Sequence, residues 1–457
     1  MLHLNDTIAA ISTPLAPGAI GIVRLSGNKS LLISKKIISF HNKSSIQSHR
    51  FYYGFIKESD SILDQIMVVY FQAPKSFTGE DMVEIYCHGS IWLVQHILEL
   101  IIHNGARLAE AGEFSRRAFL HSKIDLVQAE AIDDLIKAKT LQSHQLSIAN
   151  LQGKLSSRLL QMQQTIKEQC IYLELELDFS EEDLEFVSRT HFLKNLNLLM
   201  QEIDLLLNSF KYGRMLREGA KVVLIGKTNV GKSSLLNRLL QQDRALVSEI
   251  PGTTRDFIDA ELDINGFLFQ IIDNAGIRIT DDPIEQQGVI RAEQNLQHAD
   301  IAVVVFDQSQ YLDDNDFYVI EKIKQSTSFP LIIANKSDLA LDKVSQQLKE
   351  IFVQEVISLS AHTGEGVSLL EQQLQHLVVT QKNENESIII SKFRHYNALY
   401  QAKEYLLHAI ESTKANLSPE FISADLREAL NSVGEILGQV STDDLLNDIF
   451  TTFCIGK

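Results

Sequence analysis

The chain has 457 residues, enough for about three domains of ordinary size. Hydrophobic residues make up 45% of it and charged residues 22%, which is the usage of a globular protein and excludes a largely disordered or fibrous one. With 42 basic and 59 acidic residues the formal net charge is −17, which argues against a general polyanion binder, because affinity for nucleic acid depends largely on neutralising phosphates.

The first 121 residues have the pattern of a mixed α/β domain. Gly18–Ser26 and Gln65–Phe71 predict short strands bounded by turn residues. Trp92–Asn104 has the apolar spacing of a helix, and Gly105 is a suitable residue to end it.

From 122 to 217 glycine becomes rare, and the pattern changes to that of long helices. Leu126–Lys139 and Leu193–Phe210 repeat apolar residues three and four apart, as amphipathic helices do. Between them, Glu174–Glu185 has seven acidic residues among its twelve. This stretch fits either a metal site or a solvated helix end or loop, and we favour the second interpretation.

Strand-like runs alternate with helical segments from Lys221 to about 380, as in a parallel α/β domain. Helical spacing then returns in Tyr396–Thr413 and Leu426–Leu437. We therefore predict a multidomain α/β and α protein with an N-terminal α+β domain at 1–121. A helical domain, 122–217 and 381–457, would be split by an inserted α/β domain at 218–380, and two separate helical domains are the alternative.

The three cysteines, Cys87, Cys170 and Cys454, are far apart and form no C-x-x-C pair. They predict neither a zinc site nor a disulfide framework, and they favour a reducing compartment. The start MLHLNDTIAA lacks the basic residues and apolar core of a signal peptide, and no apolar run approaches the ~20 residues of a membrane-spanning helix. We expect a soluble cytoplasmic protein without membrane contact.

The segment 226–233, GKTNVGKS, fits the P-loop pattern and lies between a predicted strand, Val222–Ile225, and a helix. Its glycines let backbone N–H groups surround phosphates, and the helix N-terminus adds partial positive charge. Lys232 would reach the β- and γ-phosphates, and the Ser233 hydroxyl would bind Mg²⁺.

Further segments, ending with Ser360-Ala361, follow in the order of a Ras-like GTPase domain. PGTTRD, 251–256, supplies Thr254 as a second protein ligand of Mg²⁺, and a predicted strand at 267–272 leads to Asp273, which would hold Mg²⁺ through water. Asp338 of NKSD, 335–338, can accept two hydrogen bonds from guanine, whereas adenine offers no such pair of donors. The predicted GTP-binding residues are Asn229, Val230, Gly231, Lys232, Ser233, Ser234, Ser248, Thr253, Thr254, Asp273, Asn274, Ala275, Gly276, Asn335, Lys336, Asp338, Ser360 and Ala361.

The hydrolytic machinery differs from that of Ras-type enzymes, which carry a water-orienting Gln directly after the switch-II glycine. Ile277 stands there and is apolar, so we predict that Glu285 orients the water, beside Lys232 in the catalytic set. Arg278 either helps to hold switch II or forms a surface salt bridge. No arginine finger is evident, and Asn229 with oxygens of 248–253 could hold a monovalent cation in its place.

The P-loop, the switch segment GTTRD and the terminal FCIGK together resemble the MnmE (TrmE) family of tRNA modification GTPases. The N-terminal part adds FTGED at 77–81, CHG at 87–89, and GEF…RAFL at 112–120 running into KIDLVQAE at 123–130. The resemblance covers the whole chain.

The resemblance implies a folate-binding and dimerising N-terminal domain, a split helical domain and an inserted G domain. It implies a homodimer that works with the FAD-dependent partner MnmG, as a heterotetramer or larger complex. Together they would add an aminomethyl or carboxymethylaminomethyl group to C5 of the wobble uridine of certain tRNAs. A reduced folate, 5-formyl- or 5,10-methylene-tetrahydrofolate, would supply the carbon, and potassium-dependent GTP hydrolysis would be coupled to G-domain dimerisation.

By position, the resemblance also implies site residues. The K⁺ ligands are Asn229, Ser248, Ile250 and Thr253, and Glu285 falls on the water-positioning glutamate. The folate residues are Arg24, Glu84, Lys123 and Lys457. Arg and Lys suit the carboxylates of a folate, and Glu suits the N–H donors of its pterin ring.

The sequence departs from the family pattern in three places: Asn274 and Ser248 stand where Thr is usual, and the pair His121-Ser122 replaces an Asn followed by a small or acidic residue. Cys454 is either a nucleophile or a small residue with a packing role, and no neighbouring base is evident to activate it.

The alternative function is a GTPase switch for ribosome assembly, which shares P-loops of this type. Such proteins usually carry a basic RNA-binding module, and no GXXG clamp in a basic setting is evident here. A helical scaffold with an inactive G domain is disfavoured, because the residues of the nucleotide chemistry are all present.

Overall fold

The computed structural model describes residues 6–41, 45–59, 61–178, 189–241, 260–273, 283–326, 328–339, 342–382 and 388–456. The chain divides into two compact units: Met1–Asp133 with Asn150–Gln163 and Asn431–Lys457, and Asp134–Ala149 with Gln164–Leu430. Each unit contains a β-sheet and α-helices, which confirms the predicted multidomain α/β and α class. The domain boundaries at 121, 217 and 380 stay predictions. Within the described ranges no helix is both long and apolar enough to span a membrane.

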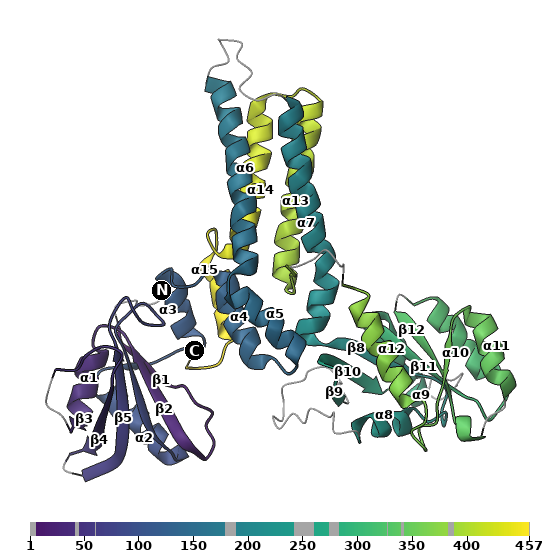
Figure 1. Cartoon of the computed structure of the whole chain (residues 1–457), viewed down its shortest axis with the longest axis horizontal. Helices are drawn as coiled ribbons and strands as arrows, with labels where there is room; N and C mark the ends of the chain where they lie inside the picture. The colour runs from purple at the N-terminus through teal and green to yellow at the C-terminus, as the bar shows by residue number, and fades with distance from the viewer. Residues whose placement is uncertain are drawn as a thin grey trace. The chain divides into compact units, whose positions relative to one another are not determined.

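The first unit contains a seven-stranded sheet with the order β3-β4-β5-β6-β2-β1-β7 (Figure 1). The strands are β1 (Ile8–Ile11), β2 (Gly18–Ser26), β3 (Ile38–Phe40), β4 (Phe51–Glu58), β5 (Ser61–Phe71), β6 (Met82–Gly89) and β7 (Arg107–Leu108), and the helices are α1 (Ser30–Ile37), α2 (Ile91–His103) and α3 (Glu113–Leu120). The strands predicted at 18–26 and 65–71 and the helix predicted at 92–104 are confirmed by β2, β5 and α2.

The two faces of this sheet have different coverings. Alternate residues such as Val23 and Leu25 pack into one core with α1 and α2. Arg24, between them, therefore points to the opposite face. There Phe114 of α3 packs against β1, whereas β4 and β5 present exposed side chains of Phe51, Tyr53 and Met67.

The C-terminal segment of the chain belongs to the same unit. Helix α15 (Asp443–Thr451) packs through Leu446 and Phe450 against Leu126 at the start of α4 (Leu126–Lys137). Ile455 then forms a β-bridge with Ala111, directly before α3. The last described residues therefore lie against the N-terminal sheet domain.

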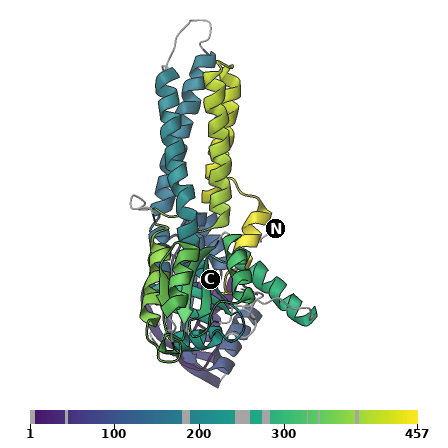
Figure 2. The ribbon, with the colours of Figure 1, turned by 90° about the vertical axis from the view of Figure 1, so that its right-hand side faces the viewer.

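Long helices in the second unit come from both sides of the inserted domain. Helix α7 (Arg189–Glu218) runs beside α13 (Phe393–Lys414) in both views (Figures 1 and 2). Lys403 pairs with Asp204 at 2.6 Å, and the N–H of Ile390 donates to Ser209 Oγ at 3.1 Å. This packing confirms the split helical domain. Outside the inserted domain, the helices not yet mentioned are α5 (Leu141–Leu151), α6 (Lys154–Asp178) and α14 (Pro419–Leu437).

The inserted domain has a six-stranded sheet with the order β13-β12-β11-β8-β10-β9, in which only β9 is antiparallel. Its strands are β8 (Ala220–Ile225), β9 (Ala260–Ile264), β10 (Phe267–Asp273), β11 (Ile301–Asp307), β12 (Phe329–Asn335) and β13 (Val356–Ser358). Its helices are α8 (Lys232–Leu240), α9 (Pro283–His298), α10 (Asp314–Lys324), α11 (Asp342–Phe352) and α12 (Val367–Val379).

Both faces of the inserted sheet are buried. Val222 and Leu224 of β8 belong to the core that contains residues of α8 and α12, and Val223 and Ile225 belong to the core formed with α9, α10 and α11. Strands buried on two faces read as continuous apolar runs, which explains the unbroken VVLI and IAVVVF segments. In such sheets, loops at the carboxyl ends of the strands form the ligand site.

Candidate functional site

Five parallel strands of the inserted domain end at one edge of the sheet, and the predicted nucleotide motifs that the structure describes follow that edge, while PGTTRD at 251–256 lies outside the described residues. The P-loop leaves β8, which lies between β10 and β11. Asp273 ends β10, Asn335 ends β12, and Ser360 comes two residues after β13. Sheet topology thus gathers segments that are more than one hundred residues apart in sequence.

The P-loop adopts the backbone shape that its glycines predict. Gly226 and Gly231 have φ values of +156° and +97°, and Gly231 is the N-cap of α8. Lys232 is buried, and its ammonium donates to the carbonyls of Gly226 at 3.1 Å and Lys227 at 3.0 Å. Burial lowers the pKa of Lys232, opposed by the nearby charge of Asp273. The loop therefore holds a cation at its centre, where phosphate oxygens would bind.

Two of the predicted Mg²⁺ ligands meet beside this loop. The Ser233 hydroxyl donates to Asp273 Oδ2 at 2.7 Å, so a hydroxyl and a carboxylate oxygen converge at the start of α8. Oxygen atoms are the ligands that Mg²⁺ prefers, so these residues fit the ion. Elsewhere in the described part of the chain no three His, Cys, Asp or Glu side chains cluster as metal ligands. The acidic stretch that begins at Glu174 is described only as far as 178.

The guanine-side motifs are joined to the P-loop and to each other by hydrogen bonds. Asn335 donates to the Val230 carbonyl at 2.7 Å and accepts from the N–H of Ala361 at 3.0 Å. Lys336 donates to the Asn229 carbonyl at 3.0 Å. Asp338 is exposed in the short helix Ser337–Leu339, with its carboxylate accessible to a base.

Two residues of this site were missed by the sequence reasoning. Asp307, at the end of β11, accepts from Lys336 at 2.6 Å. Burial alone would raise the pKa of Asp307, but hydrogen bonds from Lys336 and Ser309 bring it below its ordinary value. Arg238 of α8 donates to the carbonyls of Ala361, at 3.1 Å, and His362. The position of Asp307 at a strand end on this edge was the available signal.

Several predicted residues lie outside the described residues. They are Ser248, Ile250, Thr253, Thr254, Asn274, Ala275, Gly276, Ile277 and Arg278. Glu285 lies in the first turn of α9, and only its backbone is described. Ser234 is exposed on α8, next to Ser233.

A second polar site lies on the N-terminal sheet, where register places Arg24 of β2 opposite Glu84 of β6. Arg24 Nε and Nη2 both lie 2.8 Å from Glu84 Oε1, and the Tyr86 hydroxyl donates to Glu84 Oε2 at 2.8 Å. Burial, together with Glu84, raises the pKa of Tyr86 to about 12, so its hydroxyl stays a donor at neutral pH. The Arg24 guanidinium lies 5.8 and 5.7 Å from the ring centres of Phe77 and Phe114.

Of the other two predicted folate residues, the structure describes only Lys123. Arg24 Nη1 donates to the Gly456 carbonyl at 3.4 Å, so the backbone directly before Lys457 reaches the site, while Lys457 itself lies outside the described residues. Lys123 donates to the Pro74 carbonyl at 3.1 Å and would touch a side chain at Gly79. It therefore borders the same loop that carries Phe77.

A buried ion network supports this loop. Arg117 is fully buried and donates to Asp6 Oδ1 at 2.6 Å, Glu113 Oε1 at 2.9 Å and Glu80 Oε1 at 3.1 Å. Glu80 also accepts from Ser26 at 2.7 Å. The segments FTGED and GEF…RAFL thus meet in one network, which the sequence reasoning did not predict.

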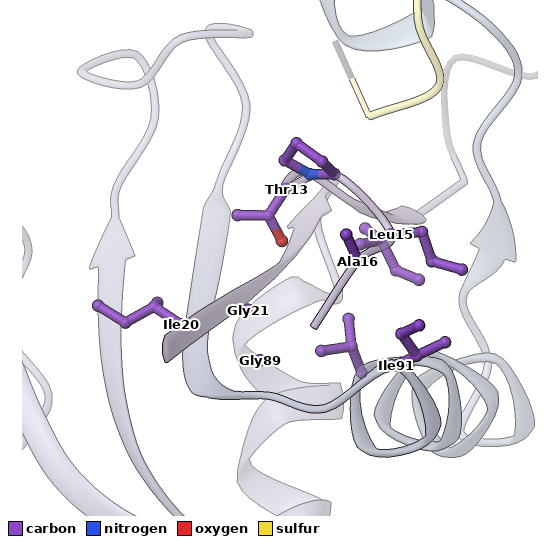
Figure 3. Close-up of a pocket in the computed structure, with 10 residues that line it drawn as sticks. Thr13, Leu15, Ala16, Ile20, Gly21, Gly89 and Ile91 are labelled. Atoms are coloured by element: carbon purple, nitrogen blue, oxygen red, sulfur yellow. The ribbon is translucent and has the colours of Figure 1, made fainter. Parts of the chain in front are cut away.

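A separate pocket lies at the start of β2 and α2 (Figure 3), lined by residues that include Thr13, Leu15, Gly21 and Ile91. A side chain at Gly21 would meet Val94 of α2, so this position faces the helix-covered side of the sheet. Arg24 faces the opposite side, so the pocket is not part of the Arg24 site.

Comparisons with known proteins cover the whole chain. Residues 7–123 match the family model "GTP-binding protein TrmE N-terminus", and 126–454 match "MnmE helical domain". The chain is similar to the tRNA modification GTPases MnmE of Cytophaga hutchinsonii, 38% identical over 99% of this chain and 98% of that protein, and of Carboxydothermus hydrogenoformans, 41% identical over 99% and 100%. The protein of that name from Aquifex aeolicus is 40% identical over 99% and 100%.

Proposed function

Because the chain belongs to the MnmE family of tRNA modification GTPases, we propose that it uses a reduced folate to modify C5 of the wobble uridine in certain tRNAs. It is a GTP hydrolase that acts in tRNA modification, with GTP and Mg²⁺ as its nucleotide and ion and tRNA as its substrate. The added group would be aminomethyl or carboxymethylaminomethyl. Because the relatives are tRNA modification GTPases, we prefer this function to the alternative of a GTPase switch for ribosome assembly.

The observation that carries the folate proposal is the Arg24–Glu84 pair beneath the C-terminal backbone. A folate combines carboxylates with a ring rich in N–H donors, and this site offers a guanidinium, a carboxylate and two aromatic rings. Lys123 and Lys457 would supply further cations for the carboxylates. The folate would donate the one-carbon unit, and FAD on a partner of the MnmG type would serve as the redox cofactor.

For hydrolysis, Lys232 would hold the β- and γ-phosphates, and Ser233, Thr254 and Asp273 would hold Mg²⁺, the last through water. Asn229, Ser248, Ile250 and Thr253 would bind K⁺ where other GTPases place an arginine. Glu285 would orient the attacking water, and Arg278 would help to hold switch II. The position of Asn229 supports the proposed K⁺ site, because Asn229 lies in the P-loop and its carbonyl accepts a hydrogen bond from Lys336.

The chain would work in the cytoplasm as a homodimer, in a heterotetramer or larger complex with MnmG, and its G domains would dimerise during hydrolysis. The sheet face away from α1 and α2 supports a homodimer through the N-terminal domain. Tyr53 and Met67 pair across β4 and β5 with about half of each side chain exposed, and Phe51 packs on Tyr86 at 5.3 Å. Exposed apolar patches of this kind mark interaction surfaces.

The folate proposal is tested by calorimetric titration of 5-formyltetrahydrofolate into the intact chain, a chain lacking Lys457, Arg24→Met, and Arg50→Met as an exposed control in the same domain. We expect saturable binding to the intact chain and Arg50→Met, and weaker binding to the other two. Binding that survives the loss of Lys457 would remove that residue from the site. Absence of binding by the folded intact chain would overturn the folate proposal and leave the GTPase assignment standing.

A further inference from the structure

The side chain of Lys227 ties the P-loop to helix α10. Its ammonium donates to Asp313 Oδ2 at 2.9 Å and to Asp316 Oδ2 at 2.7 Å. These bonds link the second residue of the P-loop to a segment more than eighty residues later in the chain. None of the predicted nucleotide, metal or catalytic roles includes Lys227.

The two aspartates are themselves fixed, because they form the capping box of α10. Asp313 accepts from the N–H groups of Asn315 and Asp316, and the Asp316 side chain accepts from the N–H of Asp313. Only 3% of the Asp316 side chain and 13% of the Lys227 side chain are exposed. A buried ion pair of this kind makes the loss of one partner costly, because the other charge is left uncompensated.

The main chain of Lys227 continues the connection to the phosphate site. Its carbonyl accepts from Lys232 Nζ at 3.0 Å, beside the Gly226 carbonyl at 3.1 Å. One residue therefore contacts the capping box through its side chain and the phosphate-binding lysine through its backbone. A shift of residue 227 would move one of the two acceptors that orient Lys232.

We propose that Lys227 is a positioning residue for GTP hydrolysis, which fixes the start of the P-loop on the N-terminus of α10 and thereby holds Lys232 in place for the β- and γ-phosphates. The proposal rests on contacts within the inserted domain and on GTP hydrolysis alone. It does not depend on the folate or potassium proposals.

The test compares Lys227→Met and Lys227→Arg with Lys322→Met, which removes a lysine of α10 that pairs with Glu293 of α9 at 2.7 Å. The measurements on the full chain are kcat and KM for GTP, the dissociation rate of a fluorescent GDP, and the melting temperature. Lys227→Met is expected to raise KM and GDP dissociation by about 10- to 100-fold, since a misplacement of about 1 Å can cost on the order of 100-fold. Lys227→Arg should restore most of the loss, and Lys322→Met should match the unmodified chain.

A lower melting temperature with unchanged KM and GDP dissociation would show a merely structural role and overturn the proposal. Should Lys227→Met fail to fold, Asp313→Asn removes one acceptor and leaves the buried pair with Asp316. That variant should raise KM and GDP dissociation in the same direction by a smaller factor. No change in either quantity for Asp313→Asn would also overturn the proposal.

Discussion

Asn335, at the end of β12, binds the P-loop residue Val230: its side-chain nitrogen donates to the Val230 carbonyl at 2.7 Å. The side-chain oxygen of Asn335 accepts from the N–H of Ala361 at 3.0 Å. One buried side chain therefore sets the spacing between the phosphate loop and the loop on the guanine side. Asn335 therefore shapes the pocket, while Asp338 is exposed and is the predicted partner of guanine.

Asn335→Ala should lower the affinity for both GTP and GDP by about 10- to 100-fold, because the Val230 carbonyl of the phosphate loop loses its buried partner at a cost of about 1–3 kcal/mol. Equilibrium binding of fluorescent nucleotides measures this. Asn237→Ala, an exposed position on α8, is the matched control and should bind normally. Equal affinities for the two variants would show that the 335–230 contact does not shape the pocket.

Asn229→Gly should abolish the difference between hydrolysis rates in KCl and NaCl while GTP still binds. Asn229 has φ +63°, which glycine adopts without strain, so the variant removes the side-chain oxygen and leaves the carbonyl bound to Lys336. Asn265→Gly, at φ +53° in the β9–β10 turn, is the matched control and should keep its potassium response. A full potassium response in Asn229→Gly would remove this side chain from the cation site.

Glu285→Gln should reduce single-turnover GTP hydrolysis by about 10²–10⁴-fold, the usual contribution of a group that activates or orients the reacting water. GTP affinity should stay unchanged, because the carboxylate acts on the water. Glu293→Gln, on the same helix α9, is the control. Normal hydrolysis by Glu285→Gln would exclude Glu285 as the water-positioning residue.

Arg117→Met should destabilise the N-terminal domain by about 3–5 kcal/mol at pH 7, because it leaves buried carboxylates without their cation. Burial alone would raise the pKa of Glu113, but hydrogen bonds from Arg107 and Arg117 bring it below its ordinary value of 4.5. The stabilisation is therefore complete above pH 4.5 and is lost as the pH falls through the lower folded pKa.

Urea unfolding at pH 7 and pH 4 should then show a smaller difference between Arg117→Met and the unmodified chain at pH 4, where protonation relieves the uncompensated carboxylates. Arg50→Met, an exposed arginine of the same domain, should show little difference at either pH. A loss that is equal at both pH values would mean that the network acts through packing and not through charge.

The motifs of the predicted nucleotide site can be recognised in the sequence because each of them is local. The P-loop, Asp273 and Asn335 each follow a buried strand, and apolar runs locate such strands without tertiary information. Resemblance indicated Arg24 and Glu84 separately, but only the register of β2 and β6 shows that they form a pair. Side chains that bridge distant segments, such as Arg117 and Lys227, could not be predicted, because no pattern in the sequence specifies partners across a tertiary contact.

The most direct test of the proposed function is a reconstituted reaction followed by mass spectrometry of tRNA nucleosides. It contains this protein, an FAD-dependent partner of the MnmG type, unmodified tRNA, GTP, Mg²⁺, K⁺, an amine donor and 5,10-methylene-tetrahydrofolate labelled with ¹³C on the methylene carbon. We expect a ¹³C-labelled substituent on C5 of the wobble uridine, in smaller amounts with the Arg24→Met and Lys232→Ala variants. A modified uridine without the label, or labelling that is equal in the absence of this protein, would contradict it.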